Sequence, residues 1–511
     1  MNHALKIGFA VGAFVTLLVG GLLLLQKREH KNTITIGFPA AWGALKPALQ
    51  HSLFGDVILG NVYEPLVRLT SRGTLRPCGA KAWTVSDDRR VFTFHIDTTR
   101  RFSDGTSLTA QHFKTAWEHG LGLSPQSANS SLADVLYKVV GAENFDSTQT
   151  LSGVRALDAQ TLQIEFKTPF RMALEYLAGI RYSAILKSGE HELGTGPYRF
   201  VSHTDTEVKF ERNPHAPVQP SFATATILKV PLESAKKELE AGTLDAYHDF
   251  GRAPEPLCQQ GTTLECFVGV ESAHEAFEVN ALPNRLFANP QMRLALQALL
   301  YAENGKALNL IRKASGSFRV DAQSFLPLQA GRIPTEEFEA LVAKGKEYIP
   351  SLIAATEKQP LVVYTSQAAA LVDVLKSLGL HLAPESGYRD FKDLQEIYYK
   401  THDVDLLYGG FSVASGDPDG IYHVLGKEGA IASPMTQREG VMALLEEGRK
   451  ILNISELPVH YQKVTRAIFT EVPYIHVGYR IAQISYRSDR VRLNEVVKGR
   501  DDDDIVLYEP L

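Results

Sequence analysis

After its first 32 residues, the chain shows two different hydrophobic periodicities, one in each half. In the first half, apolar and polar residues alternate, as they do in strands with one buried face. The alternating segments are 33–36, 92–96, 162–166 and 208–210. We therefore expect several strands here, joined by turns such as the Ser-Asp-Gly at 103–105.

In the second half, apolar residues recur every three or four positions, which predicts helices with one buried face. The expected helices start near Pro290, Ser366, Val441 and Pro458. Gly379 is expected to stop the second of them and Pro473 the fourth. Strand-like segments 361–365 and 404–408 lie between these helices, so this half is predicted to be an α/β domain.

Residues 7–25 form an uncharged run long enough to cross a bilayer, since 19 helical residues span about 28 Å. No Ala-x-Ala cleavage pattern and no lipid-accepting Cys follow it, so we expect an uncleaved transmembrane anchor. A cleaved signal with a poor site is the alternative. Lys6 precedes the run and Lys27, Arg28 and Lys31 follow it. This charge count alone would place the bulk of the chain in the cytoplasm.

Composition limits the possible functions. A length of 511 residues allows about three domain-sized units. Lys and Arg number 53 against 58 Asp and Glu, a net charge of −5 with no basic stripe, so nucleic acid is not expected as a partner.

The chain has three cysteines. Cys258 and Cys266 have seven residues between them. They could close a disulfide loop outside the cytoplasm or remain two thiols, and the spacing does not decide between these. Cys78 would be left over.

No enzyme motif is present. The chain lacks His-Glu-x-x-His, Gly-x-Ser-x-Gly and a phosphate-binding glycine loop. A Ser-x-x-Lys match at 234–237 is better explained as a capped surface helix, and the four aspartates at 501–504 as a solvated loop. We expect neither catalysis nor a cofactor or metal.

A series of short segments, in order along the chain, resembles family 5 of the bacterial extracellular solute-binding proteins, the oligopeptide, dipeptide and nickel binders. These segments are 61–67 (NVYEPLV), 82–88 (AWTVSDD), 101–110 (RFSDGTSLTA), 194–200 (GTGPYRF), 211–214 (ERNP), 238–245 (ELEAGTLD), 277–280 (FEVN), 290–296 (PQMRLAL), 416–419 (GDPD) and 471–475 (EVPYI). They extend over nearly all of residues 33–511.

The resemblance implies an α/β fold, a two-lobed periplasmic-binding-protein clamshell of the large type, with an extra subdomain in lobe one. Lobe one is expected to comprise residues 32–268 plus 479–511, and lobe two residues 269–478. The chain would cross between them near Val270 and Gly478, and the ligand would lie between the lobes, which close by a hinge motion.

The resemblance also places the loop after strand 404–408 at the ligand, as expected for loops at the carboxyl ends of strands. The expected ligand-binding residues are Phe411, Ser412, Ala414, Ser415 and Asp417, with Trp42 as an aromatic wall from lobe one. Peptide binders of the family carry an Asp where this chain has Ala414, so peptide specificity is in question. Asp417 and Asp419 are the alternative acids, although Asp417-Pro418 also fits a structural turn.

The function implied is the extracytoplasmic binding component of an ABC-type uptake system for peptides or nickel-like ligands. Its partners would be a small-molecule or peptide ligand, an ABC permease and the membrane, and we expect a monomer. The bulk of the chain would then face the periplasmic or extracellular side, which conflicts with the charge count. The alternative is a membrane-anchored sensor or accessory protein that keeps the fold without transport. A hydrolase has less support.

Overall fold

The computed structural model describes most of the chain beyond residue 31. The described residues are 32–50, 52–69, 74–123, 132–142, 150–188, 191–250, 253, 257–258, 262–315, 318–319, 331–365, 370–389, 391–411, 418–427, 432–451, 453–493 and 508–510. The expected anchor at 7–25 and the expected helix cap Ser366 lie outside them. Within these ranges, no helix is both long enough and apolar enough to cross a membrane.

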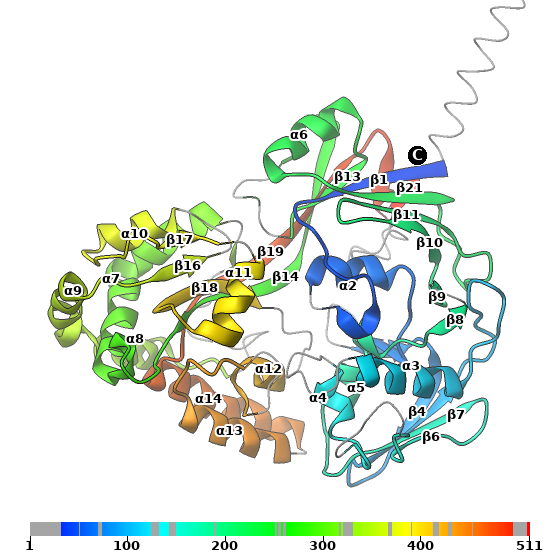
Figure 1. Ribbon diagram of the computed structural model, residues 1–511, viewed down its shortest axis with the longest axis horizontal. Helices are drawn as coiled ribbons and strands as arrows, with labels where there is room; N and C mark the ends of the chain where they lie inside the picture. The colour runs from blue at the N-terminus through cyan, green and yellow to red at the C-terminus, as the bar shows by residue number, and fades with distance from the viewer. Residues whose placement is uncertain are drawn as a thin grey trace, which may run out of the picture.

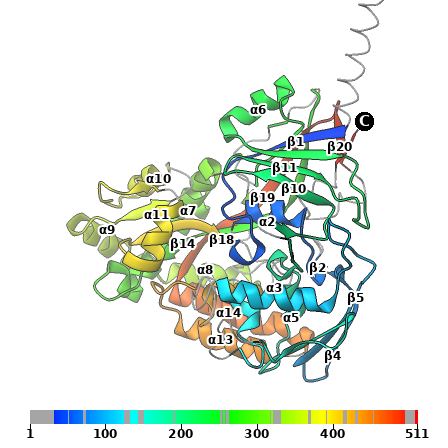
Figure 2. The same ribbon diagram turned by 45° about the vertical axis from the view of Figure 1, so that its right-hand side comes forward.

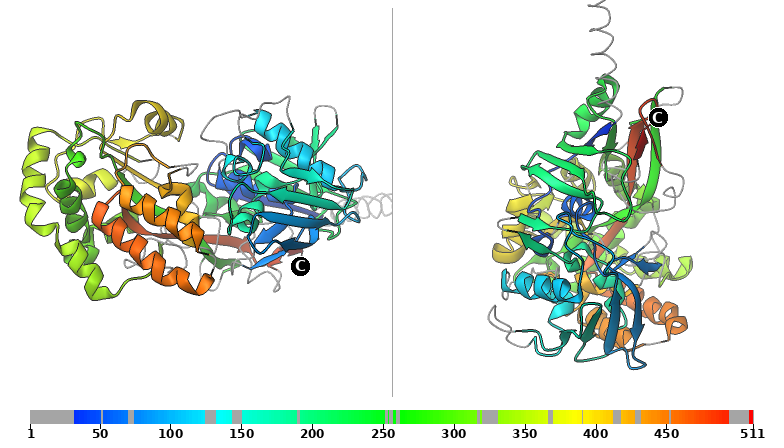
Figure 3. Two further views of the ribbon diagram at one scale, coloured as in Figure 1. Left: turned by 90° about the horizontal axis from the view of Figure 1, so that it is seen from below. Right: turned by 90° about the vertical axis from the view of Figure 1, so that its right-hand side faces the viewer.

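Two long antiparallel strands connect the lobes, β14 (Leu264–Val279) and β19 (Tyr474–Arg487). They appear in green and red in Figure 1, and Figure 3 shows the two lobes end to end with β19 running between them. Their pairing extends from Leu264 opposite Arg487 to Glu278 opposite Tyr474, with three register shifts between. Both expected crossing points, Val270 and Gly478, fall inside these strands.

One 11-stranded sheet runs through both lobes, in the order β10-β11-β12-β1-β13-β19-β14-β18-β16-β17, with β15 paired to β19. The lobe-one strands are β1 (Thr33–Phe38), β10 (Tyr198–His203), β11 (Glu207–Arg212), β12 (Thr224–Lys229) and β13 (Ala246–His248). The lobe-two strands are β15 (Phe318–Arg319), β16 (Val363–Thr365), β17 (Gly387–Tyr388) and β18 (Leu406–Phe411). The alternation at 208–210 is confirmed, since Val208 and Phe210 are buried in the lobe-one core.

A second antiparallel sheet forms a separate unit of lobe one, in the order β4-β5-β7-β6. Its strands are β4 (Ala80–Val85), β5 (Val91–Ile96), β6 (Val154–Ala156) and β7 (Thr161–Glu165), packed with α3 (Ala110–Leu123), α4 (Ala133–Leu136) and α5 (Ala173–Leu177). The apolar positions of the alternating segments 92–96 and 162–166 are all buried in its core, as predicted. Lobe one also contains α2 (Leu53–Gly60), α6 (Leu232–Ala241) and the short strand pairs β2 (Val67–Leu69) with β3 (Leu75–Pro77) and β8 (Leu186–Ser188) with β9 (His191–Leu193).

Helices cover both faces of the lobe-two sheet. Its helices are α7 (Pro290–Ser315), α8 (Thr335–Ala343), α9 (Ile349–Lys358), α10 (Leu371–Ser377), α11 (Phe391–Glu396), α12 (Tyr422–Leu425), α13 (Glu439–Lys450) and α14 (Leu457–Glu471). Phe277 points to the core shared with α7, and Ala276 to the core shared with α13 and α14. The expected helices near Pro290, Val441 and Pro458 are therefore confirmed.

The C-terminal tail returns to lobe one. β20 (Val491–Leu493) pairs with β21 (Tyr508–Pro510), and the Tyr508 hydroxyl shares a hydrogen bond with Nε2 of His248. Cys258 and Cys266 form a disulfide with their Cα atoms 5.5 Å apart, which resolves the two alternatives left by their spacing. Cys78 is a buried free thiol.

The Gly-Thr-Gly segment packs directly on the backbone after α2. A Cβ on Gly194 would lie 2.0 Å from the carbonyl oxygen of Val62, and Gly196 donates its N–H to that same oxygen at 2.9 Å. Glycine is required at 194 because no side chain fits between the two backbones.

Gly194→Ala is expected to destabilise the protein by about 1–3 kcal/mol, because the added methyl group forces two backbones apart. Gly409→Ala is a matched control, since no atom of the described residues lies within 4 Å of a Cβ there. Its change should stay within about 0.5 kcal/mol. Urea unfolding measures both effects, and equal losses would contradict the role given to the Gly194 contact.

Candidate functional site

The candidate site lies where β18 ends at Phe411. β16 and β18 are parallel, so their carboxyl ends lie at the same edge of the lobe-two sheet. Loops at such an edge border the ligand crevice of α/β folds. Ser412, Ala414, Ser415 and Asp417, the expected ligand residues that follow Phe411, lie outside the described residues, and their roles stay predictions.

Phe411 packs against residues of the two strands that connect the lobes. Its ring meets the imidazole of His274 edge-on at 4.8 Å and lies 6.1 Å from the ring of Tyr474. His274 Nε2 and His476 Nδ1 share a hydrogen bond, and Tyr479 stacks on His274 at 5.1 Å. Burial, with the neighbouring His476, holds the pKa of His274 well below its usual value. The imidazole is therefore neutral near pH 7, and with Tyr474, Tyr479 and His476 it forms a buried aromatic cluster behind the half-buried ring of Phe411.

An ion pair lies on the opposite face of the same strands. Arg480 Nε donates to Glu275 Oε1 at 2.9 Å, and both side chains are buried. Gly410 is paired directly with Glu275, and a Cβ on Gly410 would lie 2.3 Å from that carboxylate oxygen. The absence of a side chain at 410 lets the carboxylate lie over β18. The pair thus links β14 and β19, and its carboxylate lies over β18 at Gly410.

Open space lies next to Gly409, on the face of the sheet shared with Phe411. Gly409 is paired with Ala276, another small residue, and a Cβ on Gly409 would meet no described atom within 4 Å. Ala276 itself is buried in the core with α13 and α14, so among the described residues the unfilled position is the one beside Gly409. Gly409 was not among the residues predicted from the sequence, although two adjacent glycines inside a strand, just before Phe411, indicate a close backbone approach or missing side-chain packing.

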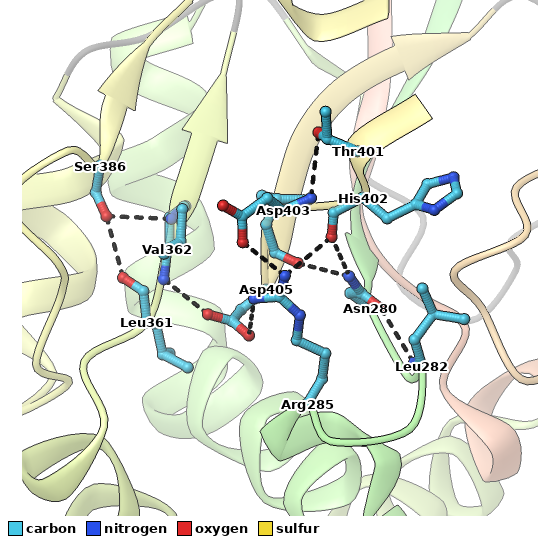
Figure 4. Close-up of polar contacts among 12 residues, drawn as sticks. Asn280, Leu282, Arg285, Leu361, Val362, Ser386, Thr401, His402, Asp403 and Asp405 are labelled. Carbon is cyan, nitrogen blue, oxygen red and sulfur yellow. Dashed lines mark hydrogen bonds and ion pairs between the residues drawn. The ribbon is translucent and has the colours of Figure 1, made fainter. Parts of the chain in front are cut away.

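The other end of β18 is fixed by polar contacts among protein groups (Figure 4). Asn280 Nδ2 donates to the carbonyl oxygen of Val404 at 2.6 Å, and Asp405 Oδ2 accepts the N–H of Val362 at 2.8 Å. Arg285 pairs with Asp403 at 2.7 Å and lies 3.6 Å from Asp405. These residues set the position of β18 between β14 and β16. Asn280, from the family-like segment 277–280, and Asp405 therefore have a structural role in lobe two, and β18 extends from them to Phe411 at the opposite edge.

Trp42 lies in the core of lobe one, with 1% of its surface exposed. Its Nε1–H donates to the carbonyl oxygen of Thr204 at 3.1 Å. A ring enclosed in this way presents no face for a ligand to stack on, so this arrangement gives no support to its predicted role as an aromatic wall.

Asp419, one of the alternative acids, is fully buried and already paired. Its Oδ2 accepts from Arg449 Nε at 3.0 Å and its Oδ1 from the Tyr461 hydroxyl at 3.1 Å. The carboxylate charge is thus balanced inside lobe two, and Asp419 is poorly suited to hold a ligand ammonium group.

Glu278 is a buried carboxyl group on the same sheet face as His274 and Ala276. It contacts the side chains of Ser433 and Tyr474 and lies near Arg438. Burial raises its pKa from 4.5 to about 7. The folded protein therefore holds this proton more tightly than the unfolded chain does.

This difference predicts a loss of stability as pH rises. The contribution of Glu278 is full below pH 4.5 and lost as pH passes through 7, which is about 2–3 kcal/mol between pH 5 and pH 8. Glu278→Gln should remove that part of the pH dependence. Urea unfolding of both proteins at the two pH values measures it, and an unchanged difference in the variant would refute the buried, proton-binding role.

Sequence relatives include two binding proteins of Escherichia coli. The periplasmic murein peptide-binding protein MppA of strain K12 is 28% identical over 171 residues, which are 33% of this chain and only 31% of MppA. The glutathione-binding protein GsiB of strain 536 is 22% identical over 417 residues, or 76% of each chain.

Solved structures share the fold over almost the whole chain. OppA of Haemophilus influenzae, in complex with the peptide RPPGFSPFR, matches with a TM-score of 0.78 at 17% identity and covers 94% of this chain and 99% of OppA. E. coli MppA matches at 0.74, with 94% and 99% covered, and its unliganded open form at 0.65, with 94% and 97% covered; both are 17% identical. The model of the bacterial extracellular solute-binding proteins, family 5, matches residues 74–433. This chain therefore belongs to family 5 of the bacterial extracellular solute-binding proteins.

Proposed function

We propose that this protein is the ligand-binding component of a bacterial ABC-type uptake system for peptides or chemically related solutes. The observation that carries the proposal is the edge at Phe411, where a half-buried aromatic ring and the unfilled position beside Gly409 lie next to the strands that join two lobes. Closure of the lobes would bury a ligand at that edge. The peptide and glutathione binders among the relatives support this ligand class.

We further propose that residues 7–25 anchor the protein to the membrane with its lobes outside the cytoplasm. The uncharged length of the run supports the anchor. Family membership and the Cys258–Cys266 disulfide support the outward orientation, since disulfides persist mainly in oxidising compartments. N-terminal sequencing of the mature protein tests retention of the anchor, and a start beyond residue 25 would refute it.

A membrane-anchored sensor with the same fold is the second candidate. Ala414, where peptide binders carry an acid, favours it, because a buried ammonium group needs an anionic partner. Native mass spectrometry of protein purified from its own membranes tests ligand binding itself. We expect a bound small molecule in the mass range of short peptides. Folded protein that carries none and takes up none from a peptide mixture would contradict the binding role.

Restoring the acid tests the proposed place of the ligand amino group. Ala414→Asp should raise the affinity for free-amine di- to pentapeptides roughly tenfold or more, because a charge-assisted hydrogen bond contributes about 1.5–3 kcal/mol. N-acetylated peptides should gain nothing, and Ala414→Asn is the uncharged control. Calorimetry measures the affinities of the unaltered, Ala414→Asp and Ala414→Asn proteins for the free-amine and N-acetylated peptides. Tight binding of free-amine peptides by the unaltered protein, lost on acetylation, would show that another acid holds the amino group.

A further inference from the structure

The two lobes also touch away from the connecting strands. The guanidinium of Arg449, on α13 of lobe two, lies over the ring of Phe170 in lobe one, with Cζ 5.7 Å from the ring centroid. Phe170 precedes α5, and Figure 2 shows α5 and α13 on the same side of the molecule. Phe170 is 6% exposed and the Arg449 side chain 17% exposed, so the contact is largely shielded from water.

Lobe two holds Arg449 in position by itself. Its Nε donates to the buried Asp419 at 3.0 Å, and its guanidinium lies 3.4 Å from the ring centroid of Tyr422. Asp419 is fixed in turn by the Tyr461 hydroxyl. Because all these partners belong to lobe two, the guanidinium keeps its place whether or not Phe170 is present.

Lobe one holds the ring in the same way. Phe170 packs edge-on against Phe166 at 5.1 Å and lies 5.7 Å from the ring of Tyr176. A second cation, the Nζ of Lys138, lies 5.6 Å from the Phe170 centroid, but it comes from lobe one. The ring therefore contacts one cation from each lobe at nearly equal distance.

Charges beside this contact also act between the lobes. Burial raises the pKa of Asp419, and Arg449 and the lobe-one Arg171 oppose the rise. Burial likewise raises the pKa of Glu175, and Asp419 adds to that rise. Arg171 thus favours the approach of lobe one to Asp419, while Glu175 disfavours it.

We propose that Phe170 and Arg449 form the contact that stabilises the closed arrangement of the lobes, and that they thereby set the equilibrium between closed and open protein. The higher TM-score to one MppA structure than to its unliganded open form supports a lobe arrangement here that differs from the open one. A cation–π contact made in only one arrangement shifts the population by its full free energy. The inference rests on the lobe movement in the proposed function, but not on the identity of the ligand.

Spin-label distances between the lobes test this inference on the ligand-free full chain. Val201 on β10 and Tyr388 on β17 are both 56% exposed and lie on the strands at the two ends of the 11-stranded sheet. Each is replaced by cysteine and labelled. Cys258 and Cys266 are bonded to each other, and burial raises the pKa of the Cys78 thiol to about 11, so the native cysteines should react little.

Phe170→Leu removes the ring, and Arg449→Lys removes the planar guanidinium but keeps the charge next to Asp419. Both are expected to raise the ratio of open to closed protein roughly two- to thirtyfold, seen as a gain in the longer distances. Lys138→Met is the matched control, since it removes the other cation from the same ring within one lobe, and should leave the distribution unchanged.

Folded Phe170→Leu and Arg449→Lys proteins with the distances of the unaltered protein would overturn the proposal, as would an equal shift in Lys138→Met. The spin-label distances are measured without ligand, whereas native mass spectrometry of the purified protein asks only whether a ligand is bound. Failure of the proposed contact between the lobes is therefore distinguishable from failure of the proposed binding function.

Discussion

The antiparallel pairing of β14 and β19 is the constraint on which the rest of the structure depends. These strands continue one sheet through both lobes, and the strands of each lobe are added on either side of them. Hydrogen bonds across the pair keep the two crossing segments side by side, so the proposed movement of the lobes would have to bend or twist this ribbon. The buried Glu275–Arg480 ion pair lies within it and resists sliding of one strand past the other.

The same strand pairing would couple the candidate site to the proposed movement of the lobes. His274 belongs to β14 and packs on Phe411, the last residue of β18 before the expected ligand loop. A twist of the ribbon therefore changes the packing beneath Phe411. Away from this ribbon, the side chains of Phe170 in lobe one and Arg449 in lobe two are in contact, and each is held in place by residues of its own lobe. The continuous pairing of β14 with β19 and the side-chain contact between Phe170 and Arg449 together suit the proposed hinge with a closed state.

Much of the fold follows from local patterns in the sequence. Alternation identified β5 and β7, and the three-to-four-residue period identified α7, α13 and α14, because each element buries one face. Ordered family-like segments then predicted two lobes. Gly194 illustrates the limit of such patterns, since the motif was visible but its contact with Val62 was not.

The site was less accessible to sequence reasoning because its contacts join distant positions. Glu275 with Arg480, His274 with His476 and Phe170 with Arg449 have no local period, and each residue alone resembles an ordinary surface or core residue. Trp42 shows the converse, since an isolated tryptophan early in the chain was expected at the ligand and lies in the core. Phe411 was predicted on the loop after strand 404–408 and is instead the last residue of β18, because the strand continues three residues further; its role at the ligand stays a prediction.

The most direct test of the central claim, that the ligand lies at the end of β18, is native mass spectrometry of a Gly409→Leu variant. The leucine side chain would extend into the space beside Phe411, where a Cβ at position 409 meets no described atom within 4 Å. We expect this protein to unfold at the same urea concentration as the unaltered protein and to carry no copurified ligand. A folded variant that retains the same ligand in the same proportion would contradict this location.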